Sequence, residues 1–195
     1  MSDKPGKQIV KGNEAGENIV LGNLTQNFQI SNTGASDGVK LLVAALEHEI
    51  EEDITRSGWI EDLQSFEEPY VVDEYRGLEE KLKVAGLSGK RIYALHQKEK
   101  FAKFLERYAL YNSAQALISL CLHKVFTDFE AYVHPQCGSV TNDELHKIIH
   151  EIVVAGVLKE YSLGAFALNH SLVWGMTYWL ADRCYVRWHE IAEHA

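Results

Sequence analysis

The sequence is poor in the residues that stabilise small secreted proteins or carry a chain through a membrane. It has three cysteines, an odd number, and their spacing matches no disulfide framework or metal-binding pattern. No signal peptide is recognisable at the N-terminus, so we expect the protein in the reducing cytoplasm. No apolar run is long enough to cross a bilayer, and we therefore expect no membrane partner.

The short motifs of several large enzyme classes are also missing. The chain has no glycine-rich phosphate loop and no G-x-S-x-G elbow, and no cysteine lies beside a plausible histidine base. Basic residues are outnumbered, because 19 Lys and Arg face 28 Asp and Glu, which gives a net charge of −9. This balance argues against nucleic acid as a partner. We expect no cofactor.

Glycine and proline are absent from one long stretch, which begins at Arg91 and reaches its first proline at Pro135. Apolar residues in it recur at three- and four-residue steps, which places them along one side of a helix. Pro135 is a plausible end, because the residue before a proline is disfavoured in helical geometry. The pattern predicts one long central helix over residues 91–134, or two helices kinked near Tyr111–Ser113.

The wide apolar stripe of this stretch has to be covered by other helices. Hydrophobic residues make up 46% of the 195-residue chain, which is enough for a core. The fold class that we predict is mainly α, a helical bundle around the long central helix. Capping residues and helical periodicity predict the other helices at residues 36–54, 73–84, 142–161 and 169–180.

Residues 1–35 differ from the rest because a short motif repeats in them. Ile9-Val10-Lys11-Gly12-Asn13 returns ten residues later as Ile19-Val20-Leu21-Gly22-Asn23, and Phe28-Gln29-Ile30-Ser31-Asn32 is a looser copy. Each copy is a short β-prone run closed by a turn signal. We predict a Gly/Asn-rich β-repeat arm over residues 1–35, followed by an all-α interaction domain over residues 36–195. A polar arm without strands is the alternative.

The strands of such an arm are too short to bury their apolar side chains within one chain. Unpaired strand edges recruit further strands, and identical copies offer the best-matched ones. We therefore expect a homo-oligomer assembled through the arm. The residues expected in its contacts are Ile9, Val10, Ile19, Val20, Phe28 and Ile30.

A pair of histidines suggests an alternative reading as a zinc-dependent hydrolase. His146 and His150 lie one helical turn apart, as two zinc ligands should, and His134, Cys137 or His170 could supply a third. The glutamate follows the pair instead of lying inside it, so the order is not that of H-E-x-x-H proteases. Two histidines at this spacing are common on helices without metal, and we expect no metal.

A second enzymatic alternative is an α-helical ribonuclease. Its mark is an arginine followed after four to six residues by a histidine, and Arg91 with His96 fits this pattern. The pattern is loose enough to occur by chance in a chain of this length. We therefore assign no catalytic residue and keep the Arg91–His96 pair as an alternative.

Three segments resemble the C-terminal domains of prokaryotic ABC-three-component systems. KEKFAKFLERYALYNSAQALI at Lys98–Ile118 is similar to the family's lysine-phenylalanine run and its tyrosine-serine-alanine-glutamine box. GMTYWLADRCYVRWHE at Gly175–Glu190 resembles the family's ending, and DEYRGLEEKLKVAG at Asp73–Gly86 resembles its Leu-Glu-x-Lys-Leu element. The motif residues for which we expect packing roles are Tyr111, Ser113, Ala114, Gln115, Gly175, Met176 and Trp188.

The resemblance implies a component of a biological-conflict system, such as anti-phage defence. These systems combine an ABC-type ATPase, a small middle component and an effector that carries this helical domain. The resemblance therefore implies a non-enzymatic coupling or scaffold subunit, whose partners are the ATPase and the middle component. The family's effectors usually carry an enzymatic domain ahead of this one, whereas here the repeat arm precedes it, so a sensor, a scaffold and an oligomeric platform stay open.

Overall fold

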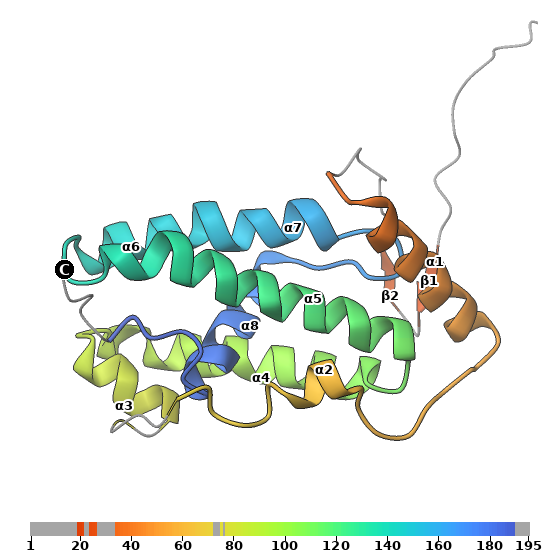
Figure 1. The fold of residues 1–195 in the computed structure, drawn as a ribbon, viewed down its shortest axis with the longest axis horizontal. Coiled ribbons are helices and arrows are strands. Elements are labelled where there is room, and N and C mark those ends of the chain that lie inside the picture. Colours follow the sequence, from red (N-terminus) through yellow and green to blue (C-terminus); the bar gives the residue numbers. More distant parts are fainter. Residues whose placement is uncertain (1–18, 22–23, 27–33, 72–74, 76, 190–195) are drawn as a thin grey trace, which may run out of the picture. The chain divides into compact units, whose positions relative to one another are not determined.

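The computed structural model describes residues 19–21, 24–26, 34–71, 75 and 77–189. The chain forms two compact units, Met1–Ser31 and Asn32–Ala195. Helices build the second unit (Figure 1), so the prediction of a mainly α fold is confirmed. The domain boundary after residue 35 stays a prediction.

In the first unit, two short strands are described. β1 (Ile19–Leu21) pairs with β2 (Leu24–Gln26) in antiparallel register, with Val20 opposite Thr25. β1 is the β-prone run of the second sequence copy. The apolar residues of the other two copies lie outside the described residues: Ile9, Val10, Phe28 and Ile30. The repeat arm as a whole therefore stays a prediction.

The second unit begins with α1 (Asp37–Glu51), whose N-cap is Ser36, and this helix ends three residues before the predicted 36–54 segment does. A short helix, α2 (Glu61–Gln64), and then α3 (Gly77–Val84) follow. A single 3-10 turn at Ser88–Lys90 leads into the stretch that lacks glycine and proline.

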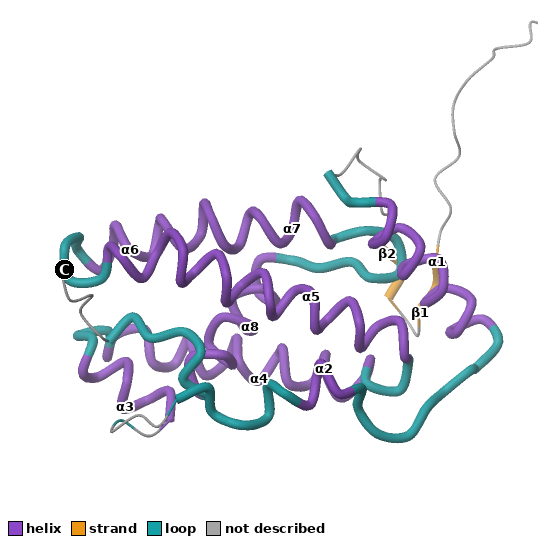
Figure 2. The backbone as a smooth tube through the Cα atoms, viewed as in Figure 1, coloured by secondary structure: helices purple, strands orange, loops and turns teal. Residues whose placement is uncertain are grey.

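The single long helix predicted over residues 91–134 is wrong. The structure has two helices, α4 (Arg91–Tyr108) and α5 (Asn112–Asp128), joined by a short loop that Figure 2 shows, and a π-helical segment at Phe129–Val133 continues α5. The break lies where the kink alternative placed it, because Tyr111 is extended, with φ of −110° and ψ of 126°.

Side chains from elsewhere in the unit explain this break. In an unbroken helix the carbonyl of Ala109 would accept a hydrogen bond from the N–H of Ser113. Instead the Gln115 side chain donates to the Ala109 carbonyl at 2.6 Å, and the Ser113 N–H donates to a Glu49 carboxylate oxygen at 3.1 Å. Tertiary hydrogen bonds have replaced one turn of helix that periodicity alone favours.

α5 lies at the centre of the helical unit. It contacts α1, α2, α4, α7 and α8, and its residues Leu117, Ile118, Cys121, Leu122 and Val125 are completely buried. α8 (His170–Asp182) packs along α4. The apolar stripe is therefore core, as predicted, although Tyr132 at its end is exposed.

One continuous rod completes the fold. It consists of α6 (Asn142–Ile148), a π-helical segment (Ile149–Val154) and α7 (Ala155–Tyr161), which together span the predicted helix at 142–161. Thr141 and Glu144 form a capping box at its start. Among the described residues, no helix has the length and apolarity that a membrane crossing requires.

Candidate functional site

Three helices that are distant in sequence are joined at Asp182, near the C-terminal end of α8. One carboxylate oxygen accepts a hydrogen bond from the Leu78 N–H at the start of α3, at 2.8 Å, and the other accepts from the Lys98 ammonium of α4, at 2.5 Å. An aspartate at the first turn of a helix satisfies N–H groups that have no partner within the helix. Asp182 therefore fixes α3 and α4 against α8.

Lys81 of α3 is completely buried at the same junction. Its ammonium donates to the Ala181 carbonyl at 2.8 Å and to the Cys184 sulfur at 2.9 Å. A cation at the C-terminus of a helix is favourable because carbonyl groups there carry partial negative charge. The buried lysine of the Leu-Glu-x-Lys-Leu element thus contributes to the fold.

The motif residues predicted to pack lie in the interior or next to it. Ala114, Gln115 and Met176 are completely buried, and Ser113 and Trp188 nearly so. Gly175 lies where α8 crosses α4, because an added Cβ would be 2.4 Å from the Gln97 carbonyl oxygen. Tyr111 is partly buried against the core and supplies the bend between α4 and α5.

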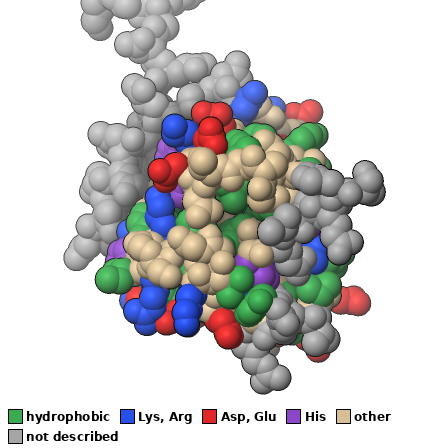
Figure 3. Space-filling model, turned by 90° about the vertical axis from the view of Figure 1, so that its left-hand side faces the viewer, with side chains coloured by type: hydrophobic (Ala, Val, Ile, Leu, Met, Phe, Trp, Pro, Cys, Tyr) green, Lys and Arg blue, Asp and Glu red, His purple; other side chains and the backbone are tan. Residues whose placement is uncertain are grey.

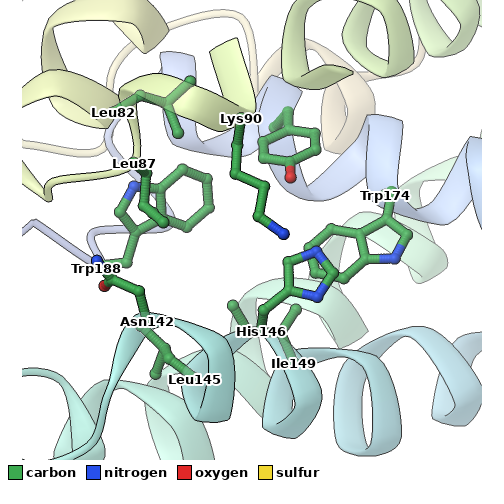
Figure 4. A pocket seen from close by; sticks show the side chains of 10 residues that line it. Leu82, Leu87, Lys90, Asn142, Leu145, His146, Ile149, Trp174 and Trp188 are labelled. Atoms are coloured by element: carbon green, nitrogen blue, oxygen red, sulfur yellow. The ribbon is translucent and has the colours of Figure 1, made fainter. Parts of the chain in front are cut away.

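A small pocket opens beside this junction, between α3, α6 and α8 (Figure 4). Its cavity volume is about 20 Å³, close to the space of one water molecule. Its walls are mostly apolar, and Lys90, Asn142 and His146 add polar side chains to them. The lining residues are Leu82, Leu87, Lys90, Asn142, Leu145, His146, Ile149, Trp174, Tyr178 and Trp188.

Stacked rings form the α6–α8 side of the pocket. The His146 ring stacks on Trp174 with centroids 4.3 Å apart, and Trp174 stacks on Tyr178 at 5.6 Å. Trp188, from the segment after α8, meets Tyr178 edge-on at 5.7 Å. This segment, Cys184–Trp188, is irregular backbone with mostly buried side chains, and not a strand.

The two histidines considered as zinc ligands both belong to this stack. His146 lies against Trp174, and His150 lies 5.2 Å from the ring of His170 and 6.5 Å from that of Trp174. Within residues 34–71 and 77–189, no group of three or more His, Cys, Asp or Glu side chains is arranged to hold a metal ion. The structure therefore gives both imidazoles a packing role.

The mouth of the pocket carries a local positive charge. Figure 4 shows the Lys90 side chain extending toward His146. Burial, together with the charges of Lys90 and His150, lowers the pKa of His146, which Asp143 only partly offsets. Burial also raises the pKa of Tyr178. His146 is therefore neutral near pH 7, and the Lys90 ammonium and the Asp143 carboxylate are charged groups that act on it.

One wall of the pocket holds an unused hydrogen-bond donor. The indole N–H of Trp188 is buried and has no partner among the described residues. Buried donors are normally paired, because an unpaired one loses its hydration without replacement.

Both residues of the alternative ribonuclease pair lie on the exposed surface of α4. Arg91 forms an exposed ion pair with Glu79, with Nε and Oε2 2.6 Å apart, and His96 is exposed on α4. The pocket instead uses Lys90, the residue before Arg91. Sequence reasoning missed the pocket, although the four-residue steps from His170 through Trp174 to Tyr178 place three rings on one face of α8.

The end of the molecule near α3 and α6 has a mixed surface. Figure 3 shows Lys and Arg side chains interspersed with Asp and Glu around visible hydrophobic side chains. The net charge of −9 therefore does not describe this end. Charged side chains next to apolar ones are a feature that a protein partner recognises.

Residues 77–188 match C-terminal domain 9 of the ABC-three component (ABC-3C) systems. The chain belongs to this family, so the resemblance of the three sequence segments is confirmed. No curated protein and no solved structure matches the chain. All 10 residues that line the pocket fall inside the matched range, whereas α1 and α2 lie outside it.

Proposed function

We propose that the chain is a non-enzymatic coupling subunit of an ABC-3C system, acting in the cytoplasm. In this role the helical domain docks onto the ABC-type ATPase or the middle component, and the N-terminal arm joins several copies of the chain. Family membership is the observation that carries the proposal.

The use of polar residues inside the domain supports this proposal. Asp182, Lys81, Lys98 and Gln115 stand in the family-like segments, and hydrogen bonds within the fold occupy each of them. A catalytic site needs convergent polar groups that face a substrate. These four residues instead bind other parts of the fold, so they stabilise the structure of a domain whose role is docking.

Co-purification of the system's components tests the coupling role. The chain, carrying an affinity tag, is produced together with the ATPase and the middle component that its neighbouring genes encode. We expect at least one of them to elute with the chain at constant stoichiometry. Elution of the chain alone, from cells in which all components are soluble, would contradict the proposal.

Phage plating tests the role in anti-phage defence. Cells that carry the whole gene set should form fewer plaques than cells that carry the set without this chain. A matched set with Arg91→Ala and His96→Ala distinguishes coupling from ribonuclease activity, because both side chains lie on the exposed surface. Loss of protection in that variant would favour the ribonuclease alternative.

A further inference from the structure

We propose that the pocket between α3, α6 and α8 receives one apolar side chain of a protein partner, and that Lys90 at its mouth binds a carboxylate next to that side chain. The proposal rests on the proposed function, since the partner is the ATPase or the middle component. The proposal specifies which face of the domain docks onto the partner and which groups of the partner this face binds.

The size of the pocket decides what kind of occupant it takes. Sites for cofactors and drug-sized ligands measure about 300–1,000 Å³. The cavity here has about 20 Å³, room for the tip of one side chain. A binding anchor of this size is typical of protein interfaces, in which a few side chains enter small preformed pockets.

The walls of the pocket are rigid and apolar. Leu82, Trp174, Tyr178 and Trp188 are almost completely buried, and they come from α3, α8 and the segment after α8. The partly buried Asp182 contact and the buried Lys81 contact join α3 to the end of α8 and oppose their separation. A pocket held in this way loses little entropy on binding, which favours affinity.

Lys90 is exceptional among the half-buried lysines of the helical unit. Lys98 pairs with Asp182, and Lys124 pairs with Asp128 and Glu160. Lys90 is likewise partly buried, yet no ion pair is found for it among the residues that the structure describes. A carboxylate supplied by a partner would give Lys90 the kind of charge-assisted contact that Lys98 and Lys124 make within the fold.

An exposed apolar surface continues outward from the pocket. Ile92 is 79% exposed and Tyr93 is 41% exposed, at the start of α4 directly after Lys90. The Tyr93 ring meets the pocket residue Tyr178 edge-on at 6.2 Å. The apolar patch beside one unpaired cation fits a partner segment that carries an aliphatic or aromatic anchor and a neighbouring Asp or Glu.

The experiment measures binding of the partner that co-purifies with the chain. The dissociation constant is determined by calorimetry for the full-length protein and for Lys90→Glu, Lys90→Arg and Ile92→Ser. Two matched controls are Lys100→Glu, an exposed lysine of α4, and Leu41→Ser, which is 73% exposed on α1. The melting temperature of each variant confirms that it is folded.

We expect Lys90→Glu to weaken binding about tenfold or more, because it replaces the cation that the partner carboxylate binds. Ile92→Ser should weaken binding several-fold, because it removes exposed apolar surface close in sequence to that cation. Lys90→Arg should keep most of the affinity, and both controls should bind like the wild type. Wild-type affinity of Lys90→Glu would overturn the proposal while leaving the coupling function intact. So would self-association that disappears in Lys90→Glu, because the occupant would then be a second copy. Absence of binding by the wild type would instead contradict the proposed function itself.

Discussion

At the scale of single residues, one missing side chain allows the two most intimately packed helices to cross. Gly175 of α8 faces the backbone of α4, where an added Cβ would lie 2.4 Å from the Gln97 carbonyl oxygen and 2.7 Å from the Phe101 Cβ. Backbone atoms cannot move aside as the end of a long side chain can. The glycine is therefore a requirement of packing, despite its low helix propensity.

Gly175→Ala should destabilise the protein by about 3 kcal/mol, because forced separation of the helices costs more than alanine's gain in helix propensity. Chemical denaturation followed by circular dichroism measures this free energy of unfolding. Gly89→Ala is the control, since nothing lies within 4 Å of the Cβ that it adds. An unfolding free energy of Gly175→Ala equal to that of the wild type would show that α4 and α8 do not approach so closely.

His146 should make stability depend on pH. Its pKa is lowered from 6.5 by burial and by the charges of Lys90 and His150, so below that pH the unfolded chain binds a proton more readily than the folded one. Its contribution to stability is therefore present above about pH 6.5 and is lost as the pH falls through the lowered folded-state pKa.

His146→Phe keeps a ring against Trp174 but cannot titrate. The wild type should lose more thermal stability than this variant between about pH 7.5 and pH 5. Differential scanning calorimetry at both pH values provides the comparison. If both proteins lost the same thermal stability, the pKa of His146 would be the same in the folded and the unfolded chain.

Packing residues could be predicted from the sequence, whereas the pairs of residues that form long-range hydrogen bonds could not. Gln115 and Gly175 were recognisable as motif residues, because packing motifs recur as local patterns. The Asp182 contacts with Leu78 and Lys98 span 104 and 84 residues, and no local pattern reports such pairs. Two acidic side chains of α1 also bind distant groups, because Glu49 accepts a hydrogen bond from the Ser113 N–H and Glu47 accepts one from the Ala165 N–H.

At the scale of elements, the turn between α4 and α5 shows why periodicity mispredicts where helices end. The apolar stripe continues through Tyr108, Tyr111 and Ala114 as it would along one helix. What breaks the helix is Gln115, whose side chain replaces backbone partners at Ala109 and also joins the segment at Gly58–Ile60. The helix lengths could be predicted only with these distant contacts in hand.

Gln115→Leu should destabilise the protein by about 2–4 kcal/mol, because the Ile60 N–H and the carbonyls of Gly58 and Ala109 would lose their partner in the interior. Urea denaturation measures the change. Gln64→Leu on the exposed surface of α2 is the control and should stay within about 0.5 kcal/mol of the wild type. A cost as small as that of the control would mean that the turn is held by packing alone.

At the scale of the whole molecule, the arm and the helical unit present different kinds of surface. The helical unit buries most of its apolar stripe, and among its exposed apolar residues are Ile92 and Tyr93, which follow Lys90 of the small pocket. β1 and β2 form a two-stranded ladder, and each strand has a second edge to which this ladder gives no partner. A lone two-stranded ladder is marginal in water, so further strands would stabilise it.

Removal of the arm should therefore lower the oligomeric mass. Multi-angle light scattering is compared for the full-length chain and for a chain that begins at Ser36. We expect the full-length chain to form a closed homo-oligomer, because closure pairs the strand edges that a single copy leaves open. The chain that begins at Ser36 should be monomeric, with the melting behaviour of an intact helical unit.

A substitution separates strand pairing from the mere presence of the arm. Ile19→Lys with Val20→Lys retains every residue of the arm but places charges on the paired run, which opposes association between identical strands. Its mass should equal that of the shortened chain, whereas Leu41→Ser on α1 should keep the full-length mass. Equal masses for the full-length and shortened chains would show that the arm does not assemble the protein. If that shared mass were an oligomer's, copies would have to meet through the helical unit, and the pocket face that Lys90 and Ile92 border would be the first surface to test.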